Sequence, residues 1–229
     1  MGEPRVLLVE DDDTLRGVIA MHLEHEGMQV HSVDDGNAAL SAFRETAPDI
    51  LVLDVMLPEL SGLEVAARVR EETQPSPGIV MITALGGEDD VVNGFRAGAD
   101  DYVVKPLRPR ELLERLRSLH RRLNPSKEAV RAFGRMRLLP DARRLEVDGQ
   151  PVHLTPTEFA LLLELTAEPH RVCSRSELLS KVFDTEHAGY ARNVDCHVTR
   201  LRRKLESHDL PSSLVQTVHG HGYSFVPTE

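Results

Sequence analysis

Two short runs, Val6-Leu7-Leu8-Val9-Glu10-Asp11-Asp12 and Ile50-Leu51-Val52-Leu53-Asp54, decide the fold of this chain. In each run, four consecutive apolar residues are followed directly by carboxylates. Such a run is typical of a parallel strand covered by helices on both faces. Similar runs occur at Ile79-Val80-Met81-Ile82 and Tyr102-Val103-Val104, with a weaker one at Val30-His31-Ser32-Val33. The sequence therefore predicts a buried five-stranded sheet in the first half of the chain.

Amphipathic stretches separate these strands. One helix face is formed by five residues at i, i+3, i+4, i+7 and i+8: Leu15, Val18, Ile19, His22 and Leu23. Comparable stripes occur within residues 38–43, 63–69, 91–95 and 112–119. Short strands that alternate with such helices predict βαβ units and a doubly wound parallel sheet, an α/β fold.

This alternation stops near residue 122. The polar stretch Leu123-Asn124-Pro125-Ser126-Lys127-Glu128 contains a helix breaker, so we expect a linker over residues 123–131 between domains 1–122 and 132–229. In the second domain, β-like runs surround helices with capping signals at Thr155 and Ser174. A further helix is expected from Asn193 to Leu205, with an apolar stripe toward the core formed by Val194, Val198, Leu201 and Leu205. This pattern predicts a smaller α+β domain.

Composition excludes several classes of protein. With 41% hydrophobic and 28% charged residues, the chain is an ordinary globular protein and no coiled coil or disordered segment. No apolar run approaches the roughly 18–20 residues of a membrane helix, and the acidic start lacks the cationic stretch of a signal peptide. Cys173 and Cys196 are too few for a disulfide framework. We expect a soluble, cytoplasmic protein.

Charge differs between the two parts. Residues 1–122 contain 13 Lys and Arg against 23 Asp and Glu, whereas the remainder contains 14 of each. Between Arg192 and Lys204, however, five basic residues accompany a single acid, Asp195. A short basic helix on a neutral domain fits a local phosphate-binding surface. The two domains are therefore expected to have different partners.

Polar residues end four strands of the first domain. Ligands bind outside the carboxyl ends of strands in an open parallel sheet. A tight carboxylate cluster repels itself and is stabilised by Mg²⁺ or Mn²⁺, and a neighbouring carboxylate can receive a phosphoryl group as an acyl phosphate. The residues expected at this edge are Glu10, Asp11, Asp54, Thr83 and Lys105.

Four motifs carry a specific resemblance across residues 5–120. They are Leu8-Val9-Glu10-Asp11-Asp12, Leu53-Asp54-Val55-Met56-Leu57-Pro58 with Gly62, Ile82-Thr83-Ala84, and Ala99-Asp100-Asp101-Tyr102-Val103-Val104-Lys105-Pro106. Together they resemble the receiver domain of bacterial two-component response regulators. The resemblance implies a flavodoxin-like fold with five parallel strands.

The resemblance also implies roles for single residues. Asp54 is the phosphoacceptor, and Mg²⁺ (or Mn²⁺) is held by Asp11, Asp54 and the Met56 carbonyl, with Glu10 acting through a metal-bound water. Lys105 pairs with the phosphoryl oxygens, and a cis peptide bond is implied at Lys105-Pro106. Thr83 and Tyr102 report the phosphorylation state.

A sensor histidine kinase is the implied phosphodonor. The alternative enzyme, an aspartyl phosphatase, needs a second Asp two residues after the nucleophile, where this chain has Met56. We therefore expect a protein that accepts a phosphoryl group on Asp54 and loses it slowly, and no turnover enzyme.

The second domain has motifs of its own. They are Leu154-Thr155-Pro156-Thr157-Glu158-Phe159, Ser174-Arg175-Ser176-Glu177-Leu178, Arg192-Asn193-Val194-Asp195 with His197, Leu201-Arg202-Arg203-Lys204-Leu205, and the ending from Thr217 to Phe225. Residues 132–227 thereby resemble the winged-helix DNA-binding domain of the OmpR/PhoB family. The resemblance implies base readout by Arg200 and Asn193, and phosphate contacts by Arg192, Thr199, Arg202 and Arg203.

Two positions of the second domain depart from this family. His219 stands where the family usually has a wing Arg, so we expect weaker or pH-dependent binding to the minor groove. Metal binding by His219 and His221 stays an alternative. Cys196 replaces a branched aliphatic residue, either as a packing thiol or as a redox sensor.

The receiver departs from the family at its dimer face. By resemblance, active receivers pair through the fourth and fifth helices and the last strand, here with Asp100, Asp101, Glu111 and Arg115. Val91 and Arg96 replace a usual Arg and a usual acid, and Arg96 would face the partner's Arg117. Exposed ion pairs contribute at most about 1 kcal/mol each, so we expect a weakened homodimer.

These features predict a transcriptional regulator that binds double-stranded promoter DNA under control of Asp54 phosphorylation. RNA polymerase is a further expected partner, and a membrane is not. The open alternative is an orphan winged-helix transcription factor whose receiver no longer depends on phosphorylation.

Overall fold

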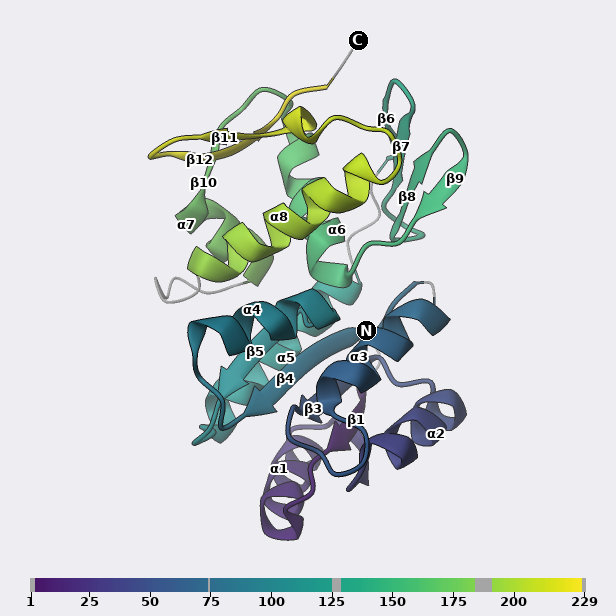
Figure 1. The fold of residues 1–229 in the computed structure, drawn as a ribbon, viewed down its shortest axis with the longest axis vertical. Coiled ribbons are helices and arrows are strands. Elements are labelled where there is room, and N and C mark those ends of the chain that lie inside the picture. Colours follow the sequence, from purple (N-terminus) through teal and green to yellow (C-terminus); the bar gives the residue numbers. More distant parts are fainter. Residues whose placement is uncertain (1–2, 74, 125–128, 184–190, 228–229) are drawn as a thin grey trace. The chain divides into compact units, whose positions relative to one another are not determined.

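The computed structural model describes residues 3–73, 75–124, 129–183 and 191–227. The chain forms two compact units, residues 1–123 and 124–229, and each is described by itself (Figure 1). The last receiver helix ends at Leu123 and the next strand begins at Arg131, so both ends of the predicted linker belong to regular elements. Residues 125–128 of that linker lie outside the described residues.

The first unit is a five-stranded parallel sheet in the order β2-β1-β3-β4-β5. Its strands are β1 (Arg5–Val9), β2 (Gln29–Val33), β3 (Ile50–Asp54), β4 (Gly78–Thr83) and β5 (Asp101–Val104). The intervening helices are α1 (Asp13–His25), α2 (Gly36–Thr46), α3 (Gly62–Glu72), α4 (Glu88–Ala97) and α5 (Pro109–Leu123). This confirms the expected α/β fold, and the order reverses between β1 and β3, where flavodoxin-like sheets bind ligands.

Local sequence explains where the helices start. Asp12 caps α1 by accepting hydrogen bonds from the backbone N–H groups of Thr14 and Leu15. Ser61 and Glu64 form a capping box at the start of α3. Asp12 is thus occupied by capping, which leaves Glu10 and Asp11 to face the strand ends.

Gly62 permits a close approach between α3 and the end of β3. A Cβ atom at this position would lie 2.0 Å from the carbonyl oxygen of Asp54. Only glycine fits there, because any side chain would push the helix away from the strand. The end of β3 is therefore held firmly by backbone contact.

The second unit combines two antiparallel sheets with helices. The four-stranded sheet consists of β6 (Arg131–Phe133), β7 (Met136–Leu139), β8 (Arg144–Val147) and β9 (Gln150–Val152). The helical elements are α6 (Pro156–Ala167), α7 (Arg175–Leu178), which continues into η1 (Leu179–Phe183), α8 (Ala191–Glu206) and η3 (Ser212–Leu214). The three-stranded sheet, in the order β10-β12-β11, consists of β10 (Cys173–Ser174), β11 (Val215–Val218) and β12 (Gly222–Phe225).

Helix α8 packs against the core of the second unit with its predicted apolar stripe. Val194, Val198, Leu201 and Leu205 are all fully buried in the core of this unit. Strands β6 and β10 were not predicted, because they are only three and two residues long. Within the described ranges, no helix has the length and apolar character that crossing a membrane requires.

Candidate functional site

Carboxylates from two strands meet at the carboxyl edge of the parallel sheet. Glu10 and Asp11 follow β1, Asp54 ends β3, and one oxygen of each lies within 4.8 Å of the others. Glu10 and Asp54 are buried, whereas Asp11 is exposed. The structure thus brings together three of the residues that the sequence placed at this edge.

Lys105 closes the cluster from the end of β5. Its Nζ donates hydrogen bonds to Asp54 Oδ2 at 2.6 Å and to Glu10 Oε1 at 2.8 Å. Partial burial acts to lower the pKa of Lys105, but these two carboxylates hold it above its ordinary value. The Lys105-Pro106 peptide bond is cis, as the resemblance implied.

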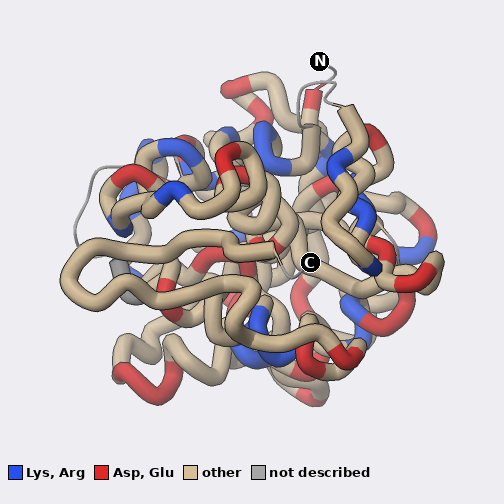
Figure 2. The backbone as a smooth tube through the Cα atoms, turned by 90° about the horizontal axis from the view of Figure 1, so that it is seen from above, with Lys and Arg blue, Asp and Glu red and all other residues tan. Residues whose placement is uncertain are grey.

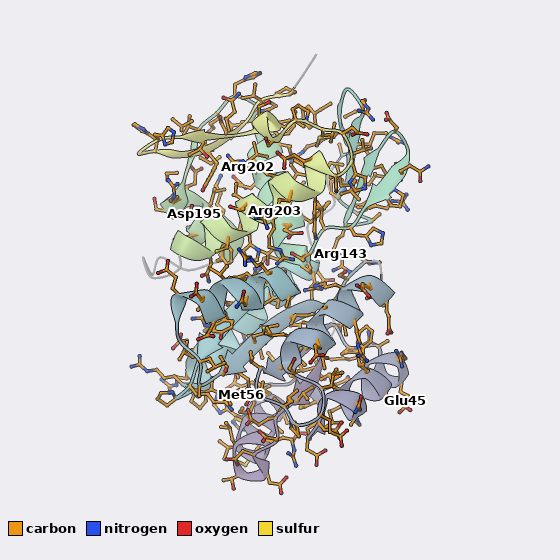
Figure 3. The ribbon with its side chains drawn as sticks, in the orientation of Figure 1. Glu45, Met56, Arg143, Asp195, Arg202 and Arg203 are labelled. Carbon is orange, nitrogen blue, oxygen red and sulfur yellow. The ribbon has the colours of Figure 1, made fainter. Side chains whose placement is uncertain are left out.

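The second oxygen of Asp54 is also fixed. Asp54 Oδ1 accepts a hydrogen bond from the Met56 backbone N–H at 2.9 Å, and the Met56 side chain points into solvent (Figure 3). Both oxygens of the carboxylate are therefore oriented by donors. A carboxylate held in this way is ready to act as a nucleophile or a ligand.

The charge of the cluster fits a divalent cation. Burial raises the pKa of the Glu10 carboxyl, and the charge of Asp54 adds to this effect, while the bond from Lys105 opposes it. Glu10 Oε2 is buried and has no hydrogen-bond partner within the described residues. Three carboxylates face one lysine, so a hard cation with oxygen ligands would satisfy both the spare oxygen and the excess charge.

Arg16 is a site residue that the sequence analysis missed. Its Nη1 donates to the backbone carbonyl of Glu10 at 2.7 Å, and its Nη2 pairs with Asp13. Arg16 thereby fixes the loop that carries Asp11. Its place in the first turn of α1, next to the acidic run, was the available signal.

Thr83 and Tyr102 are joined through one residue of the β4–α4 loop. The backbone N–H of Leu85 donates to Thr83 Oγ1 at 3.1 Å, and the Tyr102 hydroxyl donates to the Leu85 carbonyl at 2.9 Å. Burial raises the pKa of Tyr102 to about 12, so the hydroxyl stays a donor. The two residues expected to report the state of the site are therefore mechanically connected.

The structure corrects the expected place of Asp100 on an exposed dimer face. The Asp100 carboxylate is fully buried and accepts hydrogen bonds from Arg70 Nη2 at 2.6 Å and from the Ile79 N–H at 3.0 Å. Arg70 also donates to the Gly98 carbonyl at the end of α4, which draws Asp100 inward.

The other dimer-face residues form a local network. Arg115 Nη1 donates to both oxygens of Asp101 at 2.8 and 2.9 Å, and its Nη2 donates to Glu111 at 2.7 Å. Arg117 pairs with Glu26 and Glu114 of its own chain. These residues already have partners inside the receiver.

In the second unit, the two expected base readers lie away from open solvent. Arg200 Nε lies 3.2 Å from Oε1 of the buried Glu158, and Lys204 Nζ donates to Oε2 of the same carboxylate at 2.6 Å. Asn193 is also buried. Glu158 also belongs to the capping box of α6, where it accepts a hydrogen bond from the Thr155 N–H at 2.9 Å, and its buried carboxylate requires cations beside it.

The expected phosphate contacts divide into two groups. Thr199 and Arg203 are exposed on α8, and Figure 3 labels Arg203 with Arg202 and Asp195 on that helix. Arg202 instead donates to the Val215 carbonyl and, at 2.8 Å, to Thr217 Oγ1. The Arg192 side chain lies outside the described part of the structure.

The hairpin of β11 and β12 carries no fixed charge. No Lys, Arg, Asp or Glu occurs from Leu210 to Pro227, so the hairpin is drawn without charged positions in Figure 2. His219 and His221 are exposed at its tip, and neither belongs to a metal-binding group among the described residues. Cys196 is half-buried.

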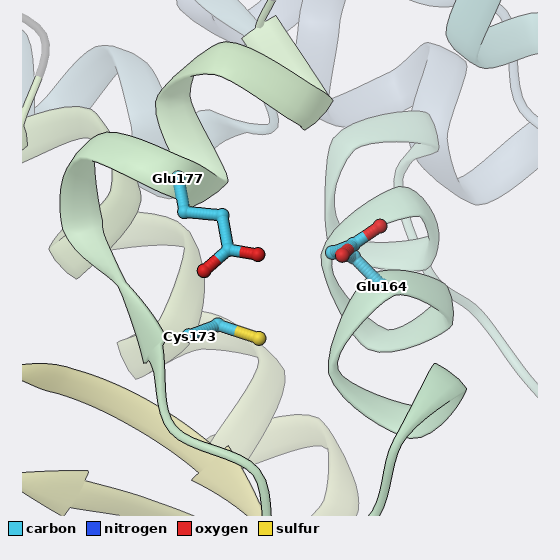
Figure 4. Close-up of side chains that lie close together, drawn as sticks. All are labelled: Glu164, Cys173 and Glu177. Atoms are coloured by element: carbon cyan, nitrogen blue, oxygen red, sulfur yellow. The ribbon is translucent and has the colours of Figure 1, made fainter.

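A second acidic group, shown in Figure 4, consists of Glu164, Cys173 and Glu177. Lys181 Nζ donates to Glu164 at 2.5 Å and pairs with Glu177, and Arg171 donates to Glu177 at 2.6 Å. Burial raises the pKa of the Cys173 thiol. These cations already balance the carboxylates, so this group is an ion-pair network of the fold.

Comparisons with known proteins agree with both halves of this description. Residues 6–117 match the response regulator receiver domain family, and residues 149–225 match the family of the transcriptional regulatory protein C-terminal domain. The transcriptional regulatory protein SrrA of Staphylococcus aureus is 39% identical, over 96% of this chain and 94% of that protein.

Solved structures show the same architecture. The response regulator DrrB of Thermotoga maritima, an OmpR/PhoB homologue, is 31% identical over 99% of this chain and 100% of that chain, with a TM-score of 0.52. A mutant of the protein RitR shares the fold with a TM-score of 0.82 at 24% identity, over 98% of this chain and 100% of that chain. The family, fold class and function expected from the sequence are confirmed: the chain belongs to the OmpR/PhoB family of two-component response regulators and is a DNA-binding transcriptional regulator.

Proposed function

We propose that a sensor histidine kinase phosphorylates Asp54 and that this modification controls binding to promoter DNA in the cytoplasm. The observation that carries the proposal is the position of Asp54, whose two oxygens are oriented by Lys105 and the Met56 N–H beside a spare oxygen of Glu10. No other carboxylate in the described residues combines these features with a neighbouring exposed acid.

The cation would be held by Glu10, Asp11, Asp54 and the Met56 carbonyl. When bound, Mg²⁺ offsets the negative charge of the transferring phosphoryl oxygens. An oxygen of Asp54 attacks phosphorus, the bond between phosphorus and the donor breaks, and its electron pair leaves with the donor. Lys105, released from the carboxylates, then pairs with a phosphoryl oxygen.

The chain accepts the phosphoryl group without turning it over. An aspartyl phosphatase uses an acid or base two residues after its nucleophile, and Met56 has no titratable group there. The acyl phosphate therefore persists long enough to act as a signal.

Thr83, Leu85 and Tyr102 supply the route by which the receiver responds. The Thr83 hydroxyl accepts a bond from Leu85, so its hydrogen is available to a phosphoryl oxygen. Movement of Thr83 toward that oxygen would pull the Leu85 backbone, which also holds the Tyr102 hydroxyl. The β4–α4 loop is the two-state element that phosphorylation biases.

DNA would be bound through α8 and the β11–β12 hairpin. Thr199 and Arg203 are exposed for phosphate contacts, and Arg200 reaches a base only when DNA replaces its ion pair with Glu158.

Homodimers through the face of α4 and α5 would be weak. Val91 replaces the family's positive charge, Arg96 replaces its negative charge, and the carboxylate of Asp100 is buried. RNA polymerase would be a partner at the promoter.

The test is DNA affinity with and without phosphorylation. Full-length wild type and Asp54→Ala are titrated onto a duplex selected from random sequence, with and without Mg²⁺ and a small-molecule phosphodonor. We expect the phosphodonor to raise only wild-type affinity, by roughly 5- to 150-fold. Equal affinities under all conditions would contradict the proposal and favour a phosphorylation-independent regulator.

A further inference from the structure

Asp195 is the one acid among five basic residues between Arg192 and Lys204. A carboxylate on a helix that approaches phosphates weakens binding through repulsion. This side chain, however, is the acceptor of two strong bonds: Tyr223 Oη donates to Oδ1 at 2.6 Å, and Arg175 Nε donates to the same oxygen at 2.8 Å. Asp195 thus connects α8 to strand β12 and to the first turn of α7.

Two guanidinium groups contact the ring of Tyr223. The Arg175 guanidinium carbon lies 4.9 Å from the centre of the ring and that of Arg202 lies 5.6 Å from it. Both distances are those of cation–π contacts. The tyrosine is buried, so its ring and its hydroxyl have fixed positions.

Arg202 makes the second connection between α8 and the hairpin. Its Nε and Nη2 donate to the Val215 carbonyl at 2.8 and 2.5 Å, and Nη2 also donates to Thr217. Thr217 pairs with Tyr223 across the antiparallel ladder of β11 and β12. Helix α8 is therefore attached to both strands of the hairpin, at Asp195 and at Arg202.

The hairpin has little freedom to shift at this junction. Tyr223 also pairs with Cys173 of β10, and a Cβ at Gly222 would lie 2.0 Å from the Cys173 carbonyl oxygen. Backbone contact thus fixes the base of the hairpin, while its tip has no charged residue except when a histidine is protonated.

We propose that Asp195 and Tyr223 are positioning residues that fix the angle between α8 and the β11–β12 hairpin, so that both elements engage one duplex together. This inference rests on the proposed DNA-binding face of α8. On this account Asp195 raises the affinity for a specific site although its charge opposes phosphate binding. An acid that contacted only solvent would instead lower the affinity for DNA, because its charge repels the phosphates.

The sign of the effect of Asp195→Asn distinguishes the two roles. The substitution removes one negative charge but leaves a weaker acceptor for Tyr223 and Arg175. Tyr223→Phe removes the hydroxyl bond and keeps an aromatic ring in contact with both guanidinium groups. Glu206→Gln is the matched control, because it removes an exposed acid at the other end of the same helix.

Full-length variants are titrated onto a duplex selected from random sequence by wild type and onto a scrambled duplex of equal composition. We expect Asp195→Asn and Tyr223→Phe to bind the selected duplex roughly tenfold more weakly, as expected when a charged hydrogen bond is lost. Their affinity for the scrambled duplex should be unchanged or higher. Hydroxyl-radical footprints should lose protection at the edge of the site, where the hairpin contacts DNA. Glu206→Gln should bind both duplexes at least as tightly as wild type.

Tighter binding of both duplexes by Asp195→Asn, or wild-type footprints for both variants, would overturn the inference. A lowered melting temperature with unchanged specificity would overturn it as well, since it would show a purely structural role. A separate variant, Arg203→Ala, tests the proposed DNA-binding face of α8. If it bound both duplexes as tightly as wild type, that face would be wrong, independently of the role of Asp195.

Discussion

Lys105 Nζ lies 2.6 Å from Asp54 Oδ2, so the cation at the end of β5 already occupies one oxygen of the carboxylate that we propose as phosphoacceptor. It also donates to Glu10 Oε1 at 2.8 Å, so Lys105 binds the carboxylates themselves, whereas Arg16 binds only the backbone carbonyls of Glu10 and Asp11. Lys105 and a divalent cation therefore compete for the same carboxylates, although both favour a phosphoryl group on Asp54.

Lys105→Met should separate these two effects. Magnesium affinity should rise on the order of tenfold or more, since a unit charge at about 4 Å is worth roughly 1–4 kcal/mol in a partly hydrated site. Phosphorylation of Asp54 should nevertheless slow, because the phosphoryl oxygens lose their cation. Calorimetric titration with Mg²⁺ measures the first effect, and Lys181→Met in the other unit is the control. Weaker Mg²⁺ binding by Lys105→Met would contradict the competition.

Gly94→Ala should displace Tyr102. A Cβ at Gly94 would lie 2.6 Å from the tyrosine ring, so the ring must leave its place over α4. Overpacking of this kind costs about 1–3 kcal/mol. Gly17→Ala is the control, because a Cβ there meets nothing within 4 Å and the helix gains roughly 1 kcal/mol. Thermal unfolding should show opposite shifts for the two variants, and equal shifts would disprove the packing argument.

Glu158→Gln should destabilise the second unit in a pH-dependent way. Burial acts to raise the pKa of Glu158, but the charges of Arg200 and Lys204 hold it below its ordinary value of 4.5. A lowered carboxyl pKa gives stability that is present above the unfolded-state pKa and lost as pH falls through the folded-state pKa. We expect a cost of about 1–3 kcal/mol at neutral pH that disappears in acid. Denaturant titrations across this range measure it, and a pH-independent difference would rule out the ion pairs as its source.

Neighbouring arginines on α8 should behave differently. Arg203→Ala should leave the melting temperature unchanged and lower the slope of log affinity against log salt by about 1, as expected for one lost phosphate contact. Arg202→Ala should lower the melting temperature, because its bonds to Val215 and Thr217 are internal. Binding measured at several salt concentrations and thermal unfolding of both variants provide the test. Identical behaviour of the two variants would show that our division of α8 is wrong.

Strand ends and helix faces were predictable because each depends on a local pattern. The apolar runs before Glu10 and Asp54 placed both carboxylates at one edge of the sheet, and the stripe from Val194 to Leu205 gave the buried face of α8. These features need only periodicity and the geometry of parallel strands.

Partner choice between distant segments was not predictable. Asp100 pairs with Arg70, thirty positions earlier in the chain, and Arg200 pairs with Glu158 across two helices. A basic residue on an amphipathic helix looks the same in sequence whether it faces solvent or a buried carboxylate. Packing alone determines whether such a residue faces solvent or the interior. Arg200 and Arg202 are partly buried, whereas Arg203 is exposed.

The intact mass of the full chain after incubation with Mg²⁺ and a small-molecule phosphodonor, with wild type beside Asp54→Ala, shows whether Asp54 accepts a phosphoryl group. We expect one added phosphoryl group on wild type and none on the variant. No addition to wild type, or equal addition to both proteins, would contradict the assignment of Asp54 as the phosphoacceptor.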